Sequence, residues 1–197
     1  MLNQLLRAIL VLSAVVLPAW FVIRIAAHVL RKRRNARTSI RSEIIYTSLV
    51  VYLILVAGIT VVPIPMSSSI HPRSDYVNLV PGVNSLECLS TAAAGKPSRM
   101  TFCLENIVGN LALFLPLGVL LPLASVALRS LKRILIIAIC FSLSIEIIQF
   151  LSRFVGSYRT VDADDVLFNV LGAGVGFGIW YLSLRSFHFK PGHQESQ

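Results

Sequence analysis

Six polar residues in otherwise apolar stretches of the chain have residue types and spacing that could form a site. They are, in chain order, Asn106, Asn110, Glu146, Gln149, Asp165 and Asn169. A carboxylate or amide that faces lipid is costly, so such residues normally face one another or a water-filled cavity. Carboxylates can act as general acids or bases, and amides can hydrogen-bond a polar ligand. The group therefore predicts a site inside a membrane protein.

The spacing within this group, extended by Asp162, places its members on shared helix faces. Residues three, four or seven apart lie on one face of a helix. Three sets meet that condition: Asn106 with Asn110, Glu146 with Gln149, and Asp162 with Asp165 and Asn169. At about 1.5 Å of rise per residue, the sets lie about 7 to 10 Å below the outer ends of their helices. We therefore expect one polar pocket that opens to the outside, with Arg159 at its mouth.

Two interpretations of this polar group are open. In the first, the acids and amides join the helices by interhelical hydrogen bonds, each worth about 0.6 kcal/mol on average. In the second, they form a ligand site, where Glu146 and Asp165 would bring two carboxylates together in a low-dielectric environment. Structural contacts usually need only one or two amides, so the number of ionisable groups favours the second interpretation.

The composition indicates which elements position these residues. Of the 197 residues, 55% are hydrophobic and 14% are charged, and the mean hydropathy is +0.76. This leaves too little polar surface for a soluble globule. A spanning α-helix needs about 20 apolar residues. Segments of about that length are Leu5–Leu30, Ile44–Ile64, Ile107–Leu128, Ile134–Leu151 and Val166–Phe187. We predict an all-α, polytopic membrane bundle of about five transmembrane helices, with a long external loop between the second and third.

The net charge of +9 is concentrated at the ends of these segments. Basic residues cluster at 31–34 and at 129–133. The positive-inside rule makes both loops cytoplasmic, which places the N-terminus outside and the C-terminus inside. The charge therefore indicates topology, and we expect a multi-pass protein of the cell membrane with no nucleic-acid partner.

The segments divide the chain into three expected parts. These are an N-terminal anchor with a basic cytoplasmic loop (1–43), a four-helix membrane domain (44–187) and a short cytoplasmic tail (188–197). Cys88 and Cys103 both fall in the external loop, where a disulfide is permitted. Such a bond would close a loop of about 15 residues and contribute roughly 3 kcal/mol in the chain-entropy model. The alternative is two free thiols beside the membrane.

Two glycines of the last segment, Gly172 and Gly176, have the spacing that lets helix backbones approach closely. Packing within the bundle is the simpler interpretation. A homodimer through the same two residues is the alternative.

The sequence contains no motif for a cofactor. The four histidines, at 28, 71, 188 and 193, lack the spacing of a transition-metal site. Phosphate-binding and dinucleotide-binding loops are absent as well. We therefore expect no cofactor and no metal, although an all-oxygen cation site built from Glu146, Asp165 and the amides is an open alternative.

Four ordered motifs contain the polar residues. They are Asn78–Pro81 in the loop, Glu105–Gly118 at the third helix, Ser144–Gln149 in the fourth and Arg159–Gly172 at the fifth. In sequence and order these motifs resemble the VanZ-like membrane family, over roughly residues 44 to 181. A departure is Gly82, where the family often has an aromatic residue, and the cysteine pair also looks particular to this chain.

The resemblance implies a role at the cell envelope. The family is named for a protein that lowers susceptibility to teicoplanin-type glycopeptide antibiotics. We expect a protein whose outer pocket binds a membrane lipid, a lipid-linked cell-wall precursor or a lipoglycopeptide antibiotic. Arg159 would meet anionic charge, and the amides would hold a polar head. The alternative is an envelope-modifying membrane enzyme with Glu146 as general acid or base, Asp165 as its partner and Arg159 stabilising an anion.

Overall fold

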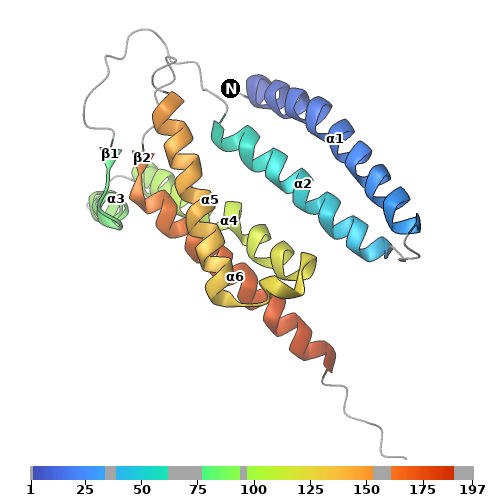
Figure 1. Cartoon of the computed structure of the whole chain (residues 1–197). Helices are drawn as coiled ribbons and strands as arrows, with labels where there is room; N and C mark the ends of the chain where they lie inside the picture. Colours follow the sequence, from blue (N-terminus) through green and yellow to red (C-terminus); the bar gives the residue numbers. More distant parts are fainter. Residues whose placement is uncertain (1, 34–38, 62–76, 94–96, 153–160, 189–197) are drawn as a thin grey trace, which may run out of the picture.

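The protein is an all-α bundle in the computed structural model, which describes residues 2–33, 39–61, 77–93, 97–152 and 161–188. Its elements are α1 (Leu2–Arg33), α2 (Ile40–Val61), β1 (Val77–Asn78), α3 (Val83–Ala93), α4 (Pro97–Ala124), the 3-10 turn η1 (Val126–Leu128), α5 (Leu131–Ser152), β2 (Val161–Asp162) and α6 (Ala163–His188). Figure 1 shows α4, α5 and α6 packed together and α1 and α2 paired along one side.

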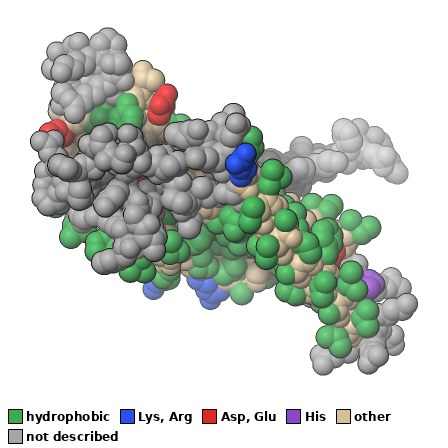
Figure 2. All heavy atoms as spheres, turned by 90° about the horizontal axis from the view of Figure 1, so that it is seen from above, with side chains coloured by type: hydrophobic (Ala, Val, Ile, Leu, Met, Phe, Trp, Pro, Cys, Tyr) green, Lys and Arg blue, Asp and Glu red, His purple; other side chains and the backbone are tan. Residues whose placement is uncertain are grey.

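Five of these helices are long and apolar enough to cross a membrane, which confirms the predicted fold class. The candidate spans are Ile9–Leu30, Ile40–Thr60, Met100–Ala124, Leu131–Ser152 and Ala163–Leu184. In Figure 2 hydrophobic side chains cover most of the described surface and charged side chains are few. This surface fits a lipid environment, since apolar groups there need no shielding from water.

The third span differs from its predicted limits. It was expected over Ile107–Leu128, but α4 begins ten residues earlier, at Pro97, and ends at Ala124. The chain then forms η1, because the Ser125 hydroxyl accepts a hydrogen bond from the Ala127 N–H at 3.3 Å and caps the short turn. The polar stretch before Ile107 is helical because a helix can extend beyond the apolar core of the bilayer.

The connection between α2 and α4 contains a strand and a short helix. β1 pairs in parallel with β2, with Val77 opposite Val161 and Asn78 opposite Asp162. This pairing brings the loop before α3 to the end of the bundle where α6 begins, which we call the strand end (Figure 1). A disulfide between Cys88 and Cys103 ties α3 to α4, with a Cα–Cα distance of 5.9 Å, as the cysteine positions suggested.

The closest helix contact is between α4 and α6. A Cβ atom at Gly172 would collide with the carbonyl oxygen of Leu111, and one at Gly176 would collide with that of Leu115. On the α4 side, Gly118 faces the backbone of Ala173 in the same way. These glycines therefore pack within the bundle, as the simpler interpretation of the sequence expects. A homodimer stays a prediction, and it would need another surface because Gly172 and Gly176 are buried in this contact.

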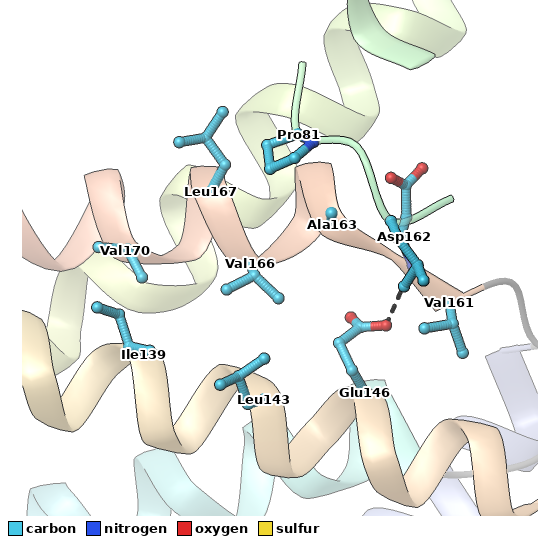
Figure 3. Close-up of a pocket in the computed structure, with 11 residues that line it drawn as sticks. Pro81, Ile139, Leu143, Glu146, Val161, Asp162, Ala163, Val166, Leu167 and Val170 are labelled. Atoms are coloured by element: carbon cyan, nitrogen blue, oxygen red, sulfur yellow. Dashed lines mark hydrogen bonds between the residues drawn. The ribbon is translucent and has the colours of Figure 1, made fainter. Parts of the chain in front are cut away.

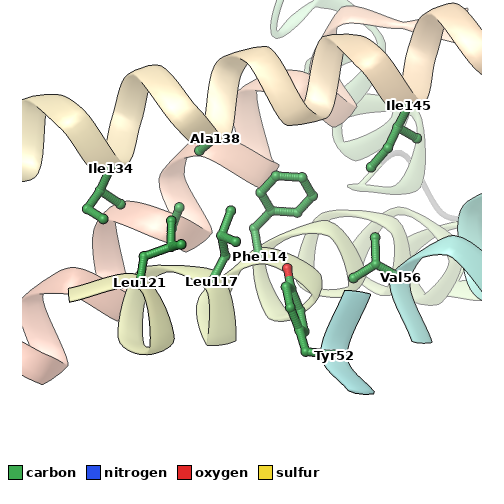
Figure 4. Close-up of a cluster of buried hydrophobic side chains, with 9 residues drawn as sticks. Tyr52, Val56, Phe114, Leu117, Leu121, Ile134, Ala138 and Ile145 are labelled. Carbon is green, nitrogen blue, oxygen red and sulfur yellow. The ribbon is translucent and has the colours of Figure 1, made fainter. Parts of the chain in front are cut away.

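A hydrophobic core lies between α2, α4, α5 and α6. Phe114 and Leu117 of α4 pack with Ile134 and Ala138 of α5 (Figure 4). Tyr52 of α2 joins them, and its hydroxyl donates a hydrogen bond to the Leu113 carbonyl at 2.9 Å. This core fixes the relative positions of the helices that contain the polar motifs.

Helix α1 is peripheral to this core. Its apolar span contains no buried residue, and it packs against α2. Near the end opposite the strands, Arg24 Nε donates to Glu43 Oε2 at 2.7 Å, and the guanidinium lies over the rings of Trp20 and Tyr46. Arg24 and Glu43 thus form an ion pair that joins α1 to α2.

Candidate functional site

The polar residues expected in one pocket lie in separate places around α6. Glu146 and Asp162 lie at the end of a groove between α5 and α6. Asn110 and Asp165 lie between α4 and α6. Asn106 is also within reach of Asp165, and Gln149 and Asn169 join neighbouring helices, as described below. The prediction of one shared polar pocket is therefore wrong.

The groove between α5 and α6 has a volume of about 520 Å³. Apolar side chains form most of its lining: Ile139 and Leu143 on α5, Val166, Leu167 and Val170 on α6, and Leu79, Pro81 and Val161 from the loop and strand at the strand end. Figure 3 shows these side chains facing a common space, with Glu146 near Val161 at one end and Ile139 and Val170 at the other. The groove is therefore amphipathic along its length, since its two acidic residues lie at the strand end.

Glu146 is the buried carboxylate of this groove. It is 6% exposed, and one of its oxygens accepts a hydrogen bond from the main-chain N–H of Asp162 at 3.2 Å (Figure 3). A buried charge of this kind needs hydrogen-bond donors around it. The contact therefore both satisfies the carboxylate and positions it against the start of α6.

Asp165 faces the opposite side of α6. Its carboxylate accepts a hydrogen bond from Asn110 Nδ2 at 2.6 Å, and Asn106 lies within hydrogen-bonding reach of it. Successive residues of a helix project about 100° apart. Asp165 can therefore face α4 while the next residue, Val166, lines the groove. The expected meeting of Asp165 with Asn110 is present, but the hydrogen bonds of Asp165 and Glu146 go to different partners.

The two remaining amides are buried between helices. Asn169 Nδ2 donates to the hydroxyl of Ser142 at 2.9 Å, which joins α6 to α5. Gln149 Nε2 donates to the carbonyl of Thr60 at 3.0 Å, which joins α5 to α2. These contacts agree with the first interpretation from the sequence, that of interhelical hydrogen bonds, for this part of the polar group.

Asp162 and Asp164 organise the loop above the groove. The Asp162 carboxylate accepts hydrogen bonds from the side-chain amides of Asn78 at 3.0 Å and Asn84 at 2.8 Å. Asp164 is fully buried and accepts from the main-chain N–H groups of Gly82 and Ser85 and from the Ser85 hydroxyl. Both N–H groups belong to the start of α3, so Asp164 caps this helix from a distant part of the chain.

Sequence reasoning missed this second role of the acidic motif. Asn84, Ser85 and Asp164 were not singled out as site residues. A signal was available: Asn84 and Glu87 have the Asn-x-x-Glu spacing typical of a helix start, within one residue of where α3 begins. The position of Gly82 in the left-handed region, with φ of +87°, also explains a glycine after Pro81.

Arg159, expected at the pocket mouth, lies outside the described residues. Its role therefore stays a prediction.

The model of the VanZ/LLP1 family matches residues 49–184, which cover the four helices of the core and omit α1. No curated protein and no solved structure matches the chain.

Proposed function

Because the chain belongs to the VanZ-like family, whose model matches more than half of its residues, we propose that it binds a lipid-linked component of the cell envelope in the groove between α5 and α6. The observation that carries this proposal is the amphipathic lining of the groove. An apolar channel with two carboxylates at one end is complementary to a molecule with a chain and a polar head.

The apolar part of the groove suits a lipid chain. Its volume of about 520 Å³ lies within the range of roughly 300 to 1,000 Å³ that small-molecule sites occupy. Ile139, Leu143 and Leu167 line it and are also exposed on the outside of the bundle. In a membrane that outside is lipid, so a chain can enter the groove sideways.

The strand end of the groove suits the polar head of the same molecule. The carboxylate of Glu146 and the side chain of Asp162 lie there, and carboxylates accept hydrogen bonds from hydroxyl, amide and ammonium groups. Arg159 precedes the groove residue Val161 by two positions, and we propose that it meets anionic charge on the head.

We further propose that the strand end faces outward. The basic residues Arg129, Lys132 and Arg133 lie at the opposite end, next to η1, where the positive-inside rule places the cytoplasm. The N-terminus would then be outside and the C-terminus cytoplasmic. In this orientation, binding a lipid-linked wall precursor or the acyl tail of a lipoglycopeptide would reduce susceptibility to teicoplanin-type antibiotics.

An envelope-modifying enzyme is the second candidate, because Glu146 lies where the head of a bound lipid would be. In that reaction Glu146 would exchange a proton with the head as general acid or base. Asp165 is a weaker partner for it than expected, since Asp165 is hydrogen-bonded to Asn110 between α4 and α6. Glu146→Gln separates the two candidates because glutamine keeps the hydrogen-bond acceptor and loses the exchangeable proton.

The experiment is the teicoplanin and vancomycin susceptibility of a Gram-positive host that expresses each variant at matched membrane levels. We expect the wild type and Glu146→Gln to protect against teicoplanin, because glutamine can still hydrogen-bond the head, and Arg159→Ala to lose protection. Glu105→Gln is the matched control, since Glu105 is an exposed carboxylate on α4 outside the groove. Full activity of Glu146→Gln would exclude the enzyme, and equal activity of all variants would contradict a role for the groove.

A further inference from the structure

A short apolar surface projects from the strand end beside the groove. It consists of Leu79, Val80 and Pro81 and the first turn of α3, and we call residues 79–86 the shelf. Its large apolar side chains are exposed: Leu79 76%, Val80 58%, Val83 45% and Leu86 69%. Four exposed apolar side chains within eight residues form a patch of the kind that marks an interaction site.

The polar side of the shelf is held tightly to the bundle. Asp164 accepts hydrogen bonds from Gly82 and Ser85, and Asp162 accepts one from Asn84. The disulfide between Cys88 and Cys103 fixes the following turns of α3 to α4. The shelf therefore contributes few apolar side chains to a core while its backbone is anchored by carboxylates and a covalent bond. These anchors hold the apolar side chains of the shelf at the surface of the protein and do not bury them.

The direction of α3 matches a surface that lies along a membrane. Figure 1 views α3 nearly along its axis, whereas the spanning helices α2, α4 and α6 are seen from the side. α3 thus runs across the direction of the spanning helices. It also has a polar residue on its exposed side, Glu87, which projects about 100° away from Leu86. A helix with an apolar edge and a polar edge lies at the boundary between headgroups and acyl chains.

We infer that the shelf docks into the lipid leaflet at the strand end, with Leu79 and Leu86 inserted among the upper acyl segments. The lipid surface is its partner because the shelf is continuous with the groove: Leu79 and Pro81 line both. It also adjoins the spanning helix α4 through the disulfide, and α4 exposes Phe102 near that bond. Docking places the open end of the groove at the level of the lipid headgroups, whatever molecule occupies the groove.

The experiment uses the full chain in phosphatidylcholine nanodiscs with tryptophan as a depth probe. The background is Trp20→Phe with Trp180→Phe, and single probes are added as Leu79→Trp, Leu86→Trp or Glu87→Trp. We expect lipid brominated on the upper acyl carbons to quench the fluorescence of probes 79 and 86 at least twofold. The probe at 87 is the control, and it should respond more to aqueous acrylamide.

Two outcomes would overturn the inference. Strong acrylamide quenching at 79 and 86, with no effect of brominated lipid, would place the shelf in water. Protection from both quenchers would indicate a protein partner or a second copy. Thermal unfolding of each probe variant shows whether it is folded, and since the two shelf positions are tested separately, failure of one variant leaves the other as the test.

Discussion

The two faces of α6 use polar residues and small residues in different ways. Towards α4, Gly172 and Gly176 let the backbones touch, and Asp165 is hydrogen-bonded to Asn110. Towards α5, the bulkier Val166, Leu167 and Val170 line a groove of about 520 Å³ with Glu146 at its end. One face is closed and the other is open.

This difference separates a carboxylate that lies between two closely packed helices from one that borders the groove. Asp165 lies in the close contact, where its acceptor capacity is used by an amide of the neighbouring helix. Glu146 lies beside open space, where a bound molecule could reach it. Asp165 and Glu146 therefore have different surroundings. Small residues let α4 and α6 pack closely around Asp165, whereas larger residues of α5 and α6 line the groove beside Glu146. Substitutions on each face test this contrast, and the expected effects on the free energy of unfolding decrease in the order given.

The largest effect is expected from Gly176→Leu on the closed face. The new side chain would meet the carbonyl of Leu115, and a backbone group cannot move aside as a flexible side chain can. Overpacking typically costs about 1 to 3 kcal/mol, and a backbone collision should reach at least about 3 kcal/mol. Thermal unfolding and size-exclusion chromatography measure it. Gly178→Leu is the control, because nothing lies within 4 Å of a Cβ there. Equal loss in both variants would contradict the closed contact.

A smaller effect is expected from the Asn110 and Asp165 pair. Removing either partner breaks their 2.6 Å hydrogen bond, and losing a hydrogen bond to a charged group costs about 1.5 to 3 kcal/mol. Asn106 stays within reach of Asp165, so the loss should not exceed this range. We expect Asn110→Ala and Asp165→Ala each to lower stability by such an amount. In a double-mutant cycle, interhelical hydrogen bonds in membranes couple by about 0.6 kcal/mol on average and about 1.7 at most. Strictly additive losses would show that the pair contributes no interaction.

The smallest effect on stability, with a large effect on binding, is expected from Val166→Phe on the open face. The larger side chain fills existing space between α5 and α6, so the free energy of unfolding should change by less than about 1.5 kcal/mol. Lipid that copurifies with the protein, measured by mass spectrometry, should decrease severalfold. Val175→Phe is the control, since Val175 is exposed on α6 outside the groove. Unchanged lipid content in Val166→Phe would contradict binding in the groove.

Much of the fold could be predicted from the sequence. The five apolar segments, each near 20 residues, account for five spanning helices because the thickness of a bilayer sets their length. The pairing of Cys88 with Cys103 agreed with their position in one loop. Helix α3 was not predicted as a helix, because 11 residues are too few for a clear pattern and its cap, Asp164, lies far away in the chain.

The candidate site was predicted only in part. Spacing correctly put Asn110 with Asp165. The spacing rule wrongly placed Asp165, Glu146 and all four amides in one pocket. Residues on one face of their own helix can still face different neighbouring helices. The pairing of Asn169 with Ser142 and of Gln149 with the Thr60 carbonyl depends on how two helices, α6 and α2, are placed around α5.

The sequence by itself determined the membrane environment, the number of spans and the family of this protein, because hydrophobic length and ordered motifs are properties of the chain. Only the tertiary structure decided which carboxylate lines the groove and which is bound between helices. The reason is rotational: a helix turns about 100° per residue, so the partner of each side chain depends on which helix packs at that angle and how closely. Here Gly172 and Gly176 let α4 lie close to one face of α6, and the groove lies along the face towards α5.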